Sequence, residues 1–203
     1  MLNDLDAVPW QSVRHAFGEA SEVQRMLREL LSSNRELRQS ALKELFACLV
    51  HQGTVSEASA LAVPFLFELL AEPSTPERNW IAFLLASIGV GKGYLEIHTG
   101  IDEQRWRRIL SERGTTLEAE RQREERVVSR VHHELGRGLE LLLPFLSQGQ
   151  SEIRAAVARA LSRHLERRET ILPALEAALA SETADDAIEA FREAIGLLRG
   201  GMP

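Results

Sequence analysis

Apolar residues recur along most of the chain at the spacing of amphipathic helices. They begin at Val23 and continue in groups three or four positions apart, and the same spacing resumes at Leu37 after a polar interval. Positions i, i+3, i+4 and i+7 are typical of a helix with one buried face. β-branched residues are sparse, and no alternating run extends beyond a few residues. The sequence therefore predicts an all-α fold. Its first helix should begin near Ser21, because Ser21 and Gln24 have the spacing of a capping box.

Three segments repeat an arrangement in which a proline precedes apolar residues, around Pro64, Pro144 and Pro173. Proline is tolerated in the first turn of a helix, where its missing N–H would have no intrahelical partner. Each proline is therefore predicted to begin a first helix. A second helix is predicted to follow each first helix, at residues 76–89, 151–165 and 184–198.

The helix pairs recur at intervals of 40, 80 and 29 residues, counted from Gln24 through the three prolines. Pairs at about 30 to 45 residues are typical of an α-solenoid, in which stacked pairs bury one another's apolar faces. We expect one domain, 1–203, with an N-terminal cap over 1–20 and repeats 1 and 2 over 21–90. A divergent charged segment is expected to follow over 91–134, and then repeats 3 and 4 over 135–203. The residues expected to bury the two ends are Trp10, Val13 and Phe17, and then Ile188, Phe191, Ile195 and Leu198.

Two segments resemble the opening of the second helix in HEAT repeats, x-V-R-x-x-A. They read Leu-Arg-Gln-Ser-Ala-Leu at 37–42 and Ile-Arg-Ala-Ala-Val at 153–157. The His-Gln-Gly-Thr-Val stretch at 51–55, continued to 63–66 and preceded by residues 15–18, is similar to bacterial HEAT-repeat domain-containing proteins. The resemblance implies an α-solenoid of stacked antiparallel helix pairs (HEAT-like repeats) with a charged helical insertion, and protein binding as its use. It also implies repeat-ladder roles for Arg38, Arg78 and Arg154, whereas the fourth repeat departs from the pattern at Asp185 and Asp186.

The chain carries 24 basic and 30 acidic residues, a formal net charge of −6. This balance disfavours nucleic acid as a partner and favours another protein, for instance a basic one. Cys48 is the only cysteine, which excludes an internal disulfide and a cysteine-based zinc finger. The longest apolar run, 60–67, is too short to cross a bilayer, and the first residues do not form a secretory signal. We therefore expect a cytoplasmic protein that does not enter a membrane.

The charged segment 91–134 holds nine basic and nine acidic residues among its 44. Two polar helices are predicted at 102–113 and 117–136, after an irregular loop that contains Tyr94 and His98. One interpretation is a solvated helical hairpin held by ion pairs. The other is a partner-binding surface, because Trp and Arg are enriched at interface hot spots. The residues of this proposed surface are Arg105, Trp106, Arg107 and Arg108.

The glycine-rich stretch 89–93 superficially resembles a phosphate-binding loop. Gly93 follows Lys92 where Ser or Thr would be needed, and a helix rather than a strand precedes it, so this stretch is interpreted as a helix end. Adjacent histidines His132 and His133 point about 100° apart on a helix and do not share a face for one ion. We therefore expect no metal, no cofactor and no catalytic residue.

His51 is predicted to lie at the end of a helix, where its imidazole would favour the helix dipole and Gln52 would help to shape the turn. Alternatively, His51, Gln52 and Glu57 lie in a polar pocket that contacts a ligand or partner. The sequence thus leaves two function classes open. The first is a non-enzymatic protein-binding module or adaptor, including the immunity or inhibitor type. The second is a small-ligand-binding protein or enzyme that uses a pocket around His51 and the loop of Tyr94 and His98.

Overall fold

The computed structural model describes residues 1–200, which are mostly helical, so the predicted class is confirmed. The departure from it is a short antiparallel hairpin of β1 (Arg14–His15) and β2 (Gly18–Glu19). The α-helices are α1 (Val23–Glu29), α2 (Arg35–Leu49), α3 (Glu57–Ala71), α4 (Arg78–Gly89), α5 (Tyr94–Ile97), α6 (Glu103–Glu112), α7 (Leu117–Gly136), α8 (Ser151–Leu161), α9 (Arg168–Ser181) and α10 (Asp185–Leu198). The 3-10 helices are η1 (Leu5–Ala7), η2 (Trp10–Ser12), η3 (His51–Gly53), η4 (Leu139–Leu141), η5 (Leu143–Leu146) and η6 (Leu165–Arg167).

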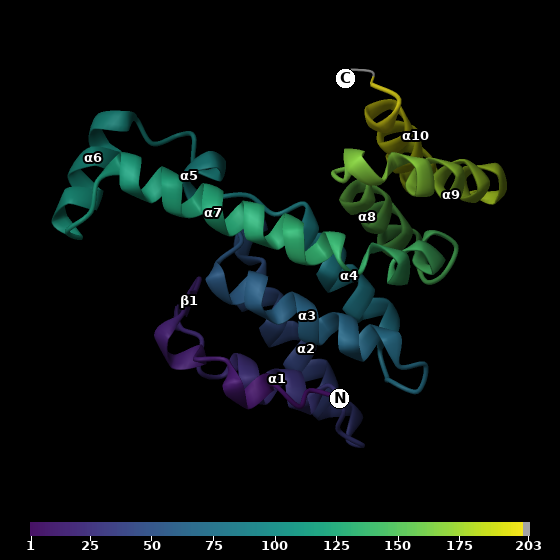
Figure 1. Ribbon diagram of the computed structural model, residues 1–203, viewed down its shortest axis with the longest axis horizontal. Coiled ribbons are helices and arrows are strands. Elements are labelled where there is room, and N and C mark those ends of the chain that lie inside the picture. Colours follow the sequence, from purple (N-terminus) through teal and green to yellow (C-terminus); the bar gives the residue numbers. More distant parts are fainter. Residues whose placement is uncertain (201–203) are drawn as a thin grey trace.

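Helices that are distant in the sequence pack side by side. α2 packs against α4, α4 against α8, and α8 against α10, while α7 lies along α3. Figure 1 shows α5 and α6 at one end of α7, with α8, α9 and α10 beyond its other end. One hydrophobic core runs through these contacts from Leu2 to Leu198 and includes the fully buried rings of Phe145 and Phe191. α4 and α8 are therefore in direct contact, although residues 90–150 separate them in the sequence.

The predicted second helices are found at nearly the predicted positions, as α4, α8 and α10. The predicted positions of the prolines within their helices were less accurate. Pro64 and Pro173 lie inside α3 and α9, although we predicted that each would begin its helix. α3 begins seven residues before Pro64 because Ser56 and Ser59 form a capping pair, in which the Ser56 N–H donates to Ser59 Oγ at 2.8 Å. Pro144 does stand in a first turn, but of the four-residue helix η5.

The N-terminal cap is partly as predicted. Trp10 is buried and its indole N–H donates to the Leu5 carbonyl at 3.0 Å, and Val13 packs against the core. Phe17 was predicted to be buried, but it lies in the turn between β1 and β2 and is 64% exposed. The predicted capping box of Ser21 and Gln24 is also wrong. α1 begins at Val23, and the Gln24 amide instead donates to the Asp6 carboxylate.

The three arginines singled out in the sequence share one role at the start of α2, α4 and α8. Each donates to a backbone carbonyl that precedes its own helix: Arg38 to Ser32 and Arg154 to Gly149 in the connecting turns, and Arg78 to Leu70 in the last turn of α3. Each also reaches the following helix pair. Arg38 pairs with Glu77 at 3.4 Å, the Arg78 guanidinium lies 5.7 Å from the Phe145 ring centroid, and Arg154 pairs with Glu182 at 2.5 Å. We call these three contacts the arginine links.

Candidate functional site

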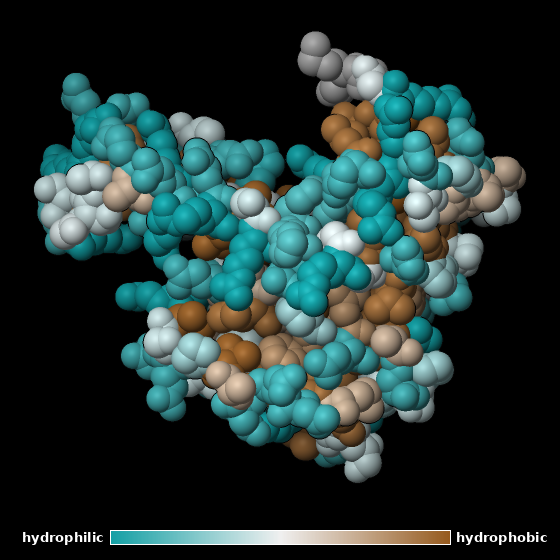
Figure 2. All heavy atoms as spheres, in the orientation of Figure 1, coloured by the Kyte–Doolittle hydropathy of each residue, from teal (hydrophilic) through white to brown (hydrophobic). Residues whose placement is uncertain are grey.

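A cleft of about 890 Å³ lies between one face of α7 and residues 89–106, and it ends beside Arg163. Figure 2 shows the outline of the molecule indented between the part formed by α5 and α6 and the part formed by the C-terminal helices. Several apolar side chains line the cleft, and charged side chains of both signs accompany them. The apolar ones are Val90, Leu95, Ile101, Trp106, Leu117, Val128 and Val131, and the charged ones are Lys92, Glu96, Glu103, Arg121, Glu124, Glu125 and Arg163.

One wall of the cleft is the glycine-rich stretch that follows α4. It ends the helix, as predicted, and then runs beside residues 53–55: the Val55 N–H donates to the Lys92 carbonyl at 3.0 Å, and the Lys92 N–H donates to Gly53 at 3.0 Å. A Cβ at Gly91 would lie 2.3 Å from Val55 Cγ1, so this approach requires glycine. The wall is therefore fixed by backbone contacts to the turn between α2 and α3.

Glu124 projects from α7 into the cleft and holds the start of α5. Its carboxylate accepts the Leu95 N–H at 3.0 Å, and a Cβ at Gly93 would meet Glu124 Oε2 at 2.4 Å. Burial raises the pKa of the Glu124 carboxyl, because the charged form loses hydration that one backbone N–H replaces incompletely. The cleft thus contains a half-buried acid that folding makes easier to protonate.

Changing Glu124 to glutamine is expected to raise the free energy of unfolding slightly at pH 7. Because the folded-state pKa lies above the unfolded one, the charged carboxylate costs stability as pH rises, whereas glutamine keeps an acceptor oxygen for Leu95. The difference between variant and wild type should shrink towards pH 4, where the Glu124 carboxyl becomes mostly protonated in both the folded and the unfolded state. Urea unfolding at the two pH values measures it. The matched control is Glu125→Gln, at an exposed neighbour; the same pH dependence there would contradict the assignment.

Tyr94 and His98, two of the predicted contact residues, lie together with Trp106. The Tyr94 and His98 rings stack at 3.8 Å, and Tyr94 meets Trp106 edge-on at 5.9 Å. The expected irregular loop is instead the single turn α5, since the His98 N–H bonds back to the Tyr94 carbonyl. Trp106 is buried against Leu110 and Leu117, so it anchors α6 to α7 as well as lining the cleft.

Arg105, Arg107 and Arg108 are all exposed on α6. Arg107 pairs with Glu103 at 2.8 Å and with Glu118 at 2.7 Å, which links α6 to α7. This contact is what the solvated-hairpin interpretation predicts. None of the three arginines lines the cleft.

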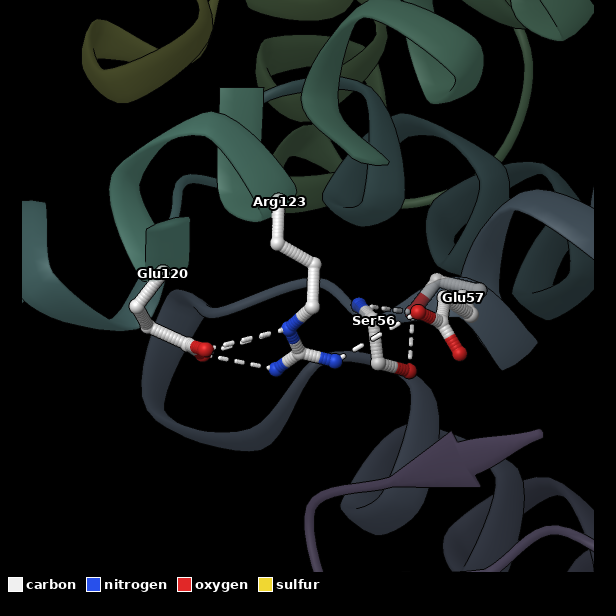
Figure 3. A network of polar contacts seen from close by, with 5 residues as sticks. Ser56, Glu57, Glu120 and Arg123 are labelled. Atoms are coloured by element: carbon white, nitrogen blue, oxygen red, sulfur yellow. Dashed lines mark hydrogen bonds and ion pairs between the residues drawn. The ribbon is translucent and has the colours of Figure 1, made fainter. Parts of the chain in front are cut away.

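Glu57, a predicted partner-binding residue, contacts α7 within the molecule. Its carboxylate lies 3.4 Å from Nη1 of Arg123, and the same guanidinium pairs with Glu120 at 2.8 Å (Figure 3). Ser56, one member of the capping pair, lies beside Glu57 at the start of α3. This network joins the first half of α7, and with it one side of the cleft, to the start of α3.

His51 and Gln52 lie in the turn after α2. Gln52 has φ 52° and Gly53 has φ 80°, so these two residues reverse the chain as predicted. The His51 carbonyl accepts hydrogen bonds from the Thr54 N–H and hydroxyl. The His51 ring meets the Phe17 ring edge-on, with the centroids 4.8 Å apart. Neither side chain is among those that line the cleft.

A second group of polar side chains was not found by sequence reasoning. His132 of α7 meets His164 and Glu166. His164 directly precedes η6, and Glu166 lies within η6, the short helix before α9. His132 and His133 do point apart, but His132 meets two residues that lie 32 and 34 positions later in the chain. The sequence offered one signal, the His-x-Glu spacing of His164 and Glu166 immediately after a helix.

Cys48 is buried, as predicted, and burial raises the pKa of its thiol to about 12. Within residues 1–200 no helix is both long enough and apolar enough to span a membrane. Comparison with family models, curated proteins and solved structures gives no match to this chain. The geometry of the cleft and of its surroundings is therefore the basis for assigning a function.

Proposed function

We propose that the protein is a non-enzymatic protein-binding module that holds a segment of another protein in the cleft along α7. The observation that carries this proposal is the composition of the cleft: apolar side chains occupy its lining beside charges of both signs. Protein interfaces combine an apolar centre with a polar rim in this way. The packing of α2, α4, α8 and α10 in succession supports an α-solenoid of HEAT-like helix pairs as the framework.

The charge of the chain favours a basic partner. Its formal net charge is −6, and long-range attraction would raise the association rate with a positively charged protein. An adaptor or an immunity-type inhibitor of a basic enzyme would both use such a surface. Binding to either is expected to weaken as the salt concentration rises, because exposed charges are screened over about 10 Å at 0.1 M.

The experiment is site-specific photo-cross-linking in the cells that produce the protein. A benzophenone side chain is placed at Glu125 or Ser129, which are exposed and line the cleft. The matched controls carry it at Gln39 on α2 and Ala177 on α9, which are exposed and outside the cleft lining. We expect both cleft positions to attach to the same protein and both controls to leave it free. Equal yields from all four positions, or no protein adduct from the cleft, would overturn the proposal.

Small-ligand binding is the second candidate, and the half-buried Glu124 carboxyl beside the cleft favours it. A ligand that forms hydrogen bonds with this group should raise the melting temperature of the wild type but not of Glu124→Gln. Such a ligand, together with no protein adduct, would assign the cleft to the small-molecule class.

A further inference from the structure

We propose that His132, His164 and Glu166 form a binding site for a divalent transition-metal ion, with Zn²⁺ the best-suited one. The site lies at the end of the cleft, since His132 itself lines the cleft. It is separate from the proposed protein-binding function, because metal binding is measured directly and without a partner.

The donor atoms already lie at ligand spacing. Glu166 Oε1 is 3.0 Å from His164 Nδ1 and 3.6 Å from His132 Nε2, and the three donor atoms lie within 4.8 Å of one another. Zinc bonds of about 2.0–2.2 Å in tetrahedral geometry place neighbouring ligand atoms about 3.3 Å apart. The two distances from Glu166 Oε1, 3.0 and 3.6 Å, fall on either side of that value. An ion would replace the hydrogen bond between His164 Nδ1 and Glu166 Oε1.

One ligand is fixed and the others can adjust. The His164 side chain is 2% exposed, whereas those of His132 and Glu166 are 44% and 57% exposed. The two imidazole rings stack at 4.0 Å with an angle of 10°. Their lone pairs therefore lie in two nearly parallel planes, and His132 must rotate for both to converge on one ion. Its exposure leaves room for that rotation, while buried His164 stays in place.

The surroundings favour a neutral imidazole and tolerate a cation. Burial lowers the pKa of His164, which favours the neutral imidazole, the form that binds a metal through its unprotonated nitrogen. Arg167 is the nearby positive charge that opposes an ion, but its guanidinium pairs with Glu140 at 2.8 Å. Two imidazoles and a carboxylate suit zinc better than magnesium or calcium, which prefer oxygen ligands. Three protein ligands also leave a fourth position for water or for a group from a bound partner.

The test is titration of the full-length protein with Zn²⁺ against a chelating indicator, and with Co²⁺ as a probe that absorbs visible light. We expect one ion per chain. His132→Ala and Glu166→Gln should each weaken affinity at least about tenfold. His164→Ala is avoided because it opens a cavity. The matched control is His133→Ala, which removes the adjacent exposed histidine and should leave affinity unchanged.

Circular dichroism establishes that each variant is folded before titration, and the melting temperature gives a second measurement. Zn²⁺ should raise it for the wild type and His133→Ala, but not for His132→Ala. Equal loss of affinity in His133→Ala would indicate binding by exposed histidines in general and would overturn the proposal. A wild type that binds no ion, or binds it unchanged after loss of His132 and Glu166, would overturn it too.

Discussion

Replacing Phe191 by alanine is expected to lower the free energy of unfolding by about 3–5 kcal/mol. The ring is fully buried on α10, which packs against both α8 and α9. Its removal loses the transfer free energy of the ring and leaves a cavity that the surrounding helices close only in part. Urea unfolding followed by circular dichroism at pH 7 measures the change. The slope of the transition should stay near the wild-type value if unfolding remains one cooperative step.

Phe17→Ala is the matched control, since it removes the same ring from the surface. Phe17 is 64% exposed and meets His51 and His15 only edge-on, so the expected change is within about 0.5 kcal/mol. A change as small for Phe191→Ala as for Phe17→Ala would contradict the burial of Phe191. A change as large for Phe17→Ala as for Phe191→Ala would instead restore the initial expectation that Phe17 belongs to the N-terminal core.

Arg154→Ala is expected to cost about 2–4 kcal/mol at pH 7, because it leaves the carboxylate of Glu182 without its guanidinium. Arg154 Nε and Nη2 bind the two Glu182 oxygens at 2.5 and 2.7 Å, and the side chains are only 18% and 4% exposed. The N–H groups of Thr183 and Ala184 also donate to Glu182 and offset part of the loss. The hydrogen bond from Arg154 is the main reason that the pKa of Glu182 falls to about 2.

The pH dependence of this pair has a definite sign. A carboxyl whose pKa is lower in the folded than in the unfolded state stabilises the protein above its unfolded pKa, about 4.5 here. That contribution disappears as the pH falls from about 4.5 to about 2. The curves of stability against pH for wild type and Arg154→Ala should therefore converge across this interval. Arg159→Ala, which breaks a looser, exposed pair with Glu193 at 3.6 Å, should cost under about 1 kcal/mol. A cost at pH 7 as small as that of Arg159→Ala would contradict the assigned role of Arg154.

The sequence predicted the bounds of a helix well where residues next to it in the chain fix its ends. Asp102 and Thr116 cap α6 and α7 with their side chains, and both helices have close to the predicted bounds. In α10, Phe191, Ile195 and Leu198 are buried where the spacing placed them, whereas Ile188 is only partly buried. Pro64 misled the prediction because proline is preferred in a first turn, whereas here the Ser56 and Ser59 pair begins the helix two turns earlier.

The candidate site could be predicted only in part, since it depends on contacts between distant segments. Nothing in the spacing of residues 89–93 indicates that they run beside residues 53–55, or that Glu124 will hold the start of α5. His98 and Trp106, which were assigned from the sequence to two different candidate sites, both line the cleft, whereas Glu57 and Arg107 form ion pairs within the molecule. His132 and His164 meet only because α7 and η6 come together in three dimensions.

The arginine links differ in chemistry, and this difference gives the C-terminal end of the molecule a sensitivity to acid that its middle lacks. The link of Arg154 requires an ionised carboxylate on Glu182, whose pKa the pairing lowers to about 2. The link of Arg78 rests on the face of the Phe145 ring and on a backbone carbonyl, neither of which takes up a proton in this range. Acid should therefore loosen α9–α10 first, in hydrogen exchange, while α4 stays protected. Loss of order would then spread from the C-terminal end of the molecule towards its centre.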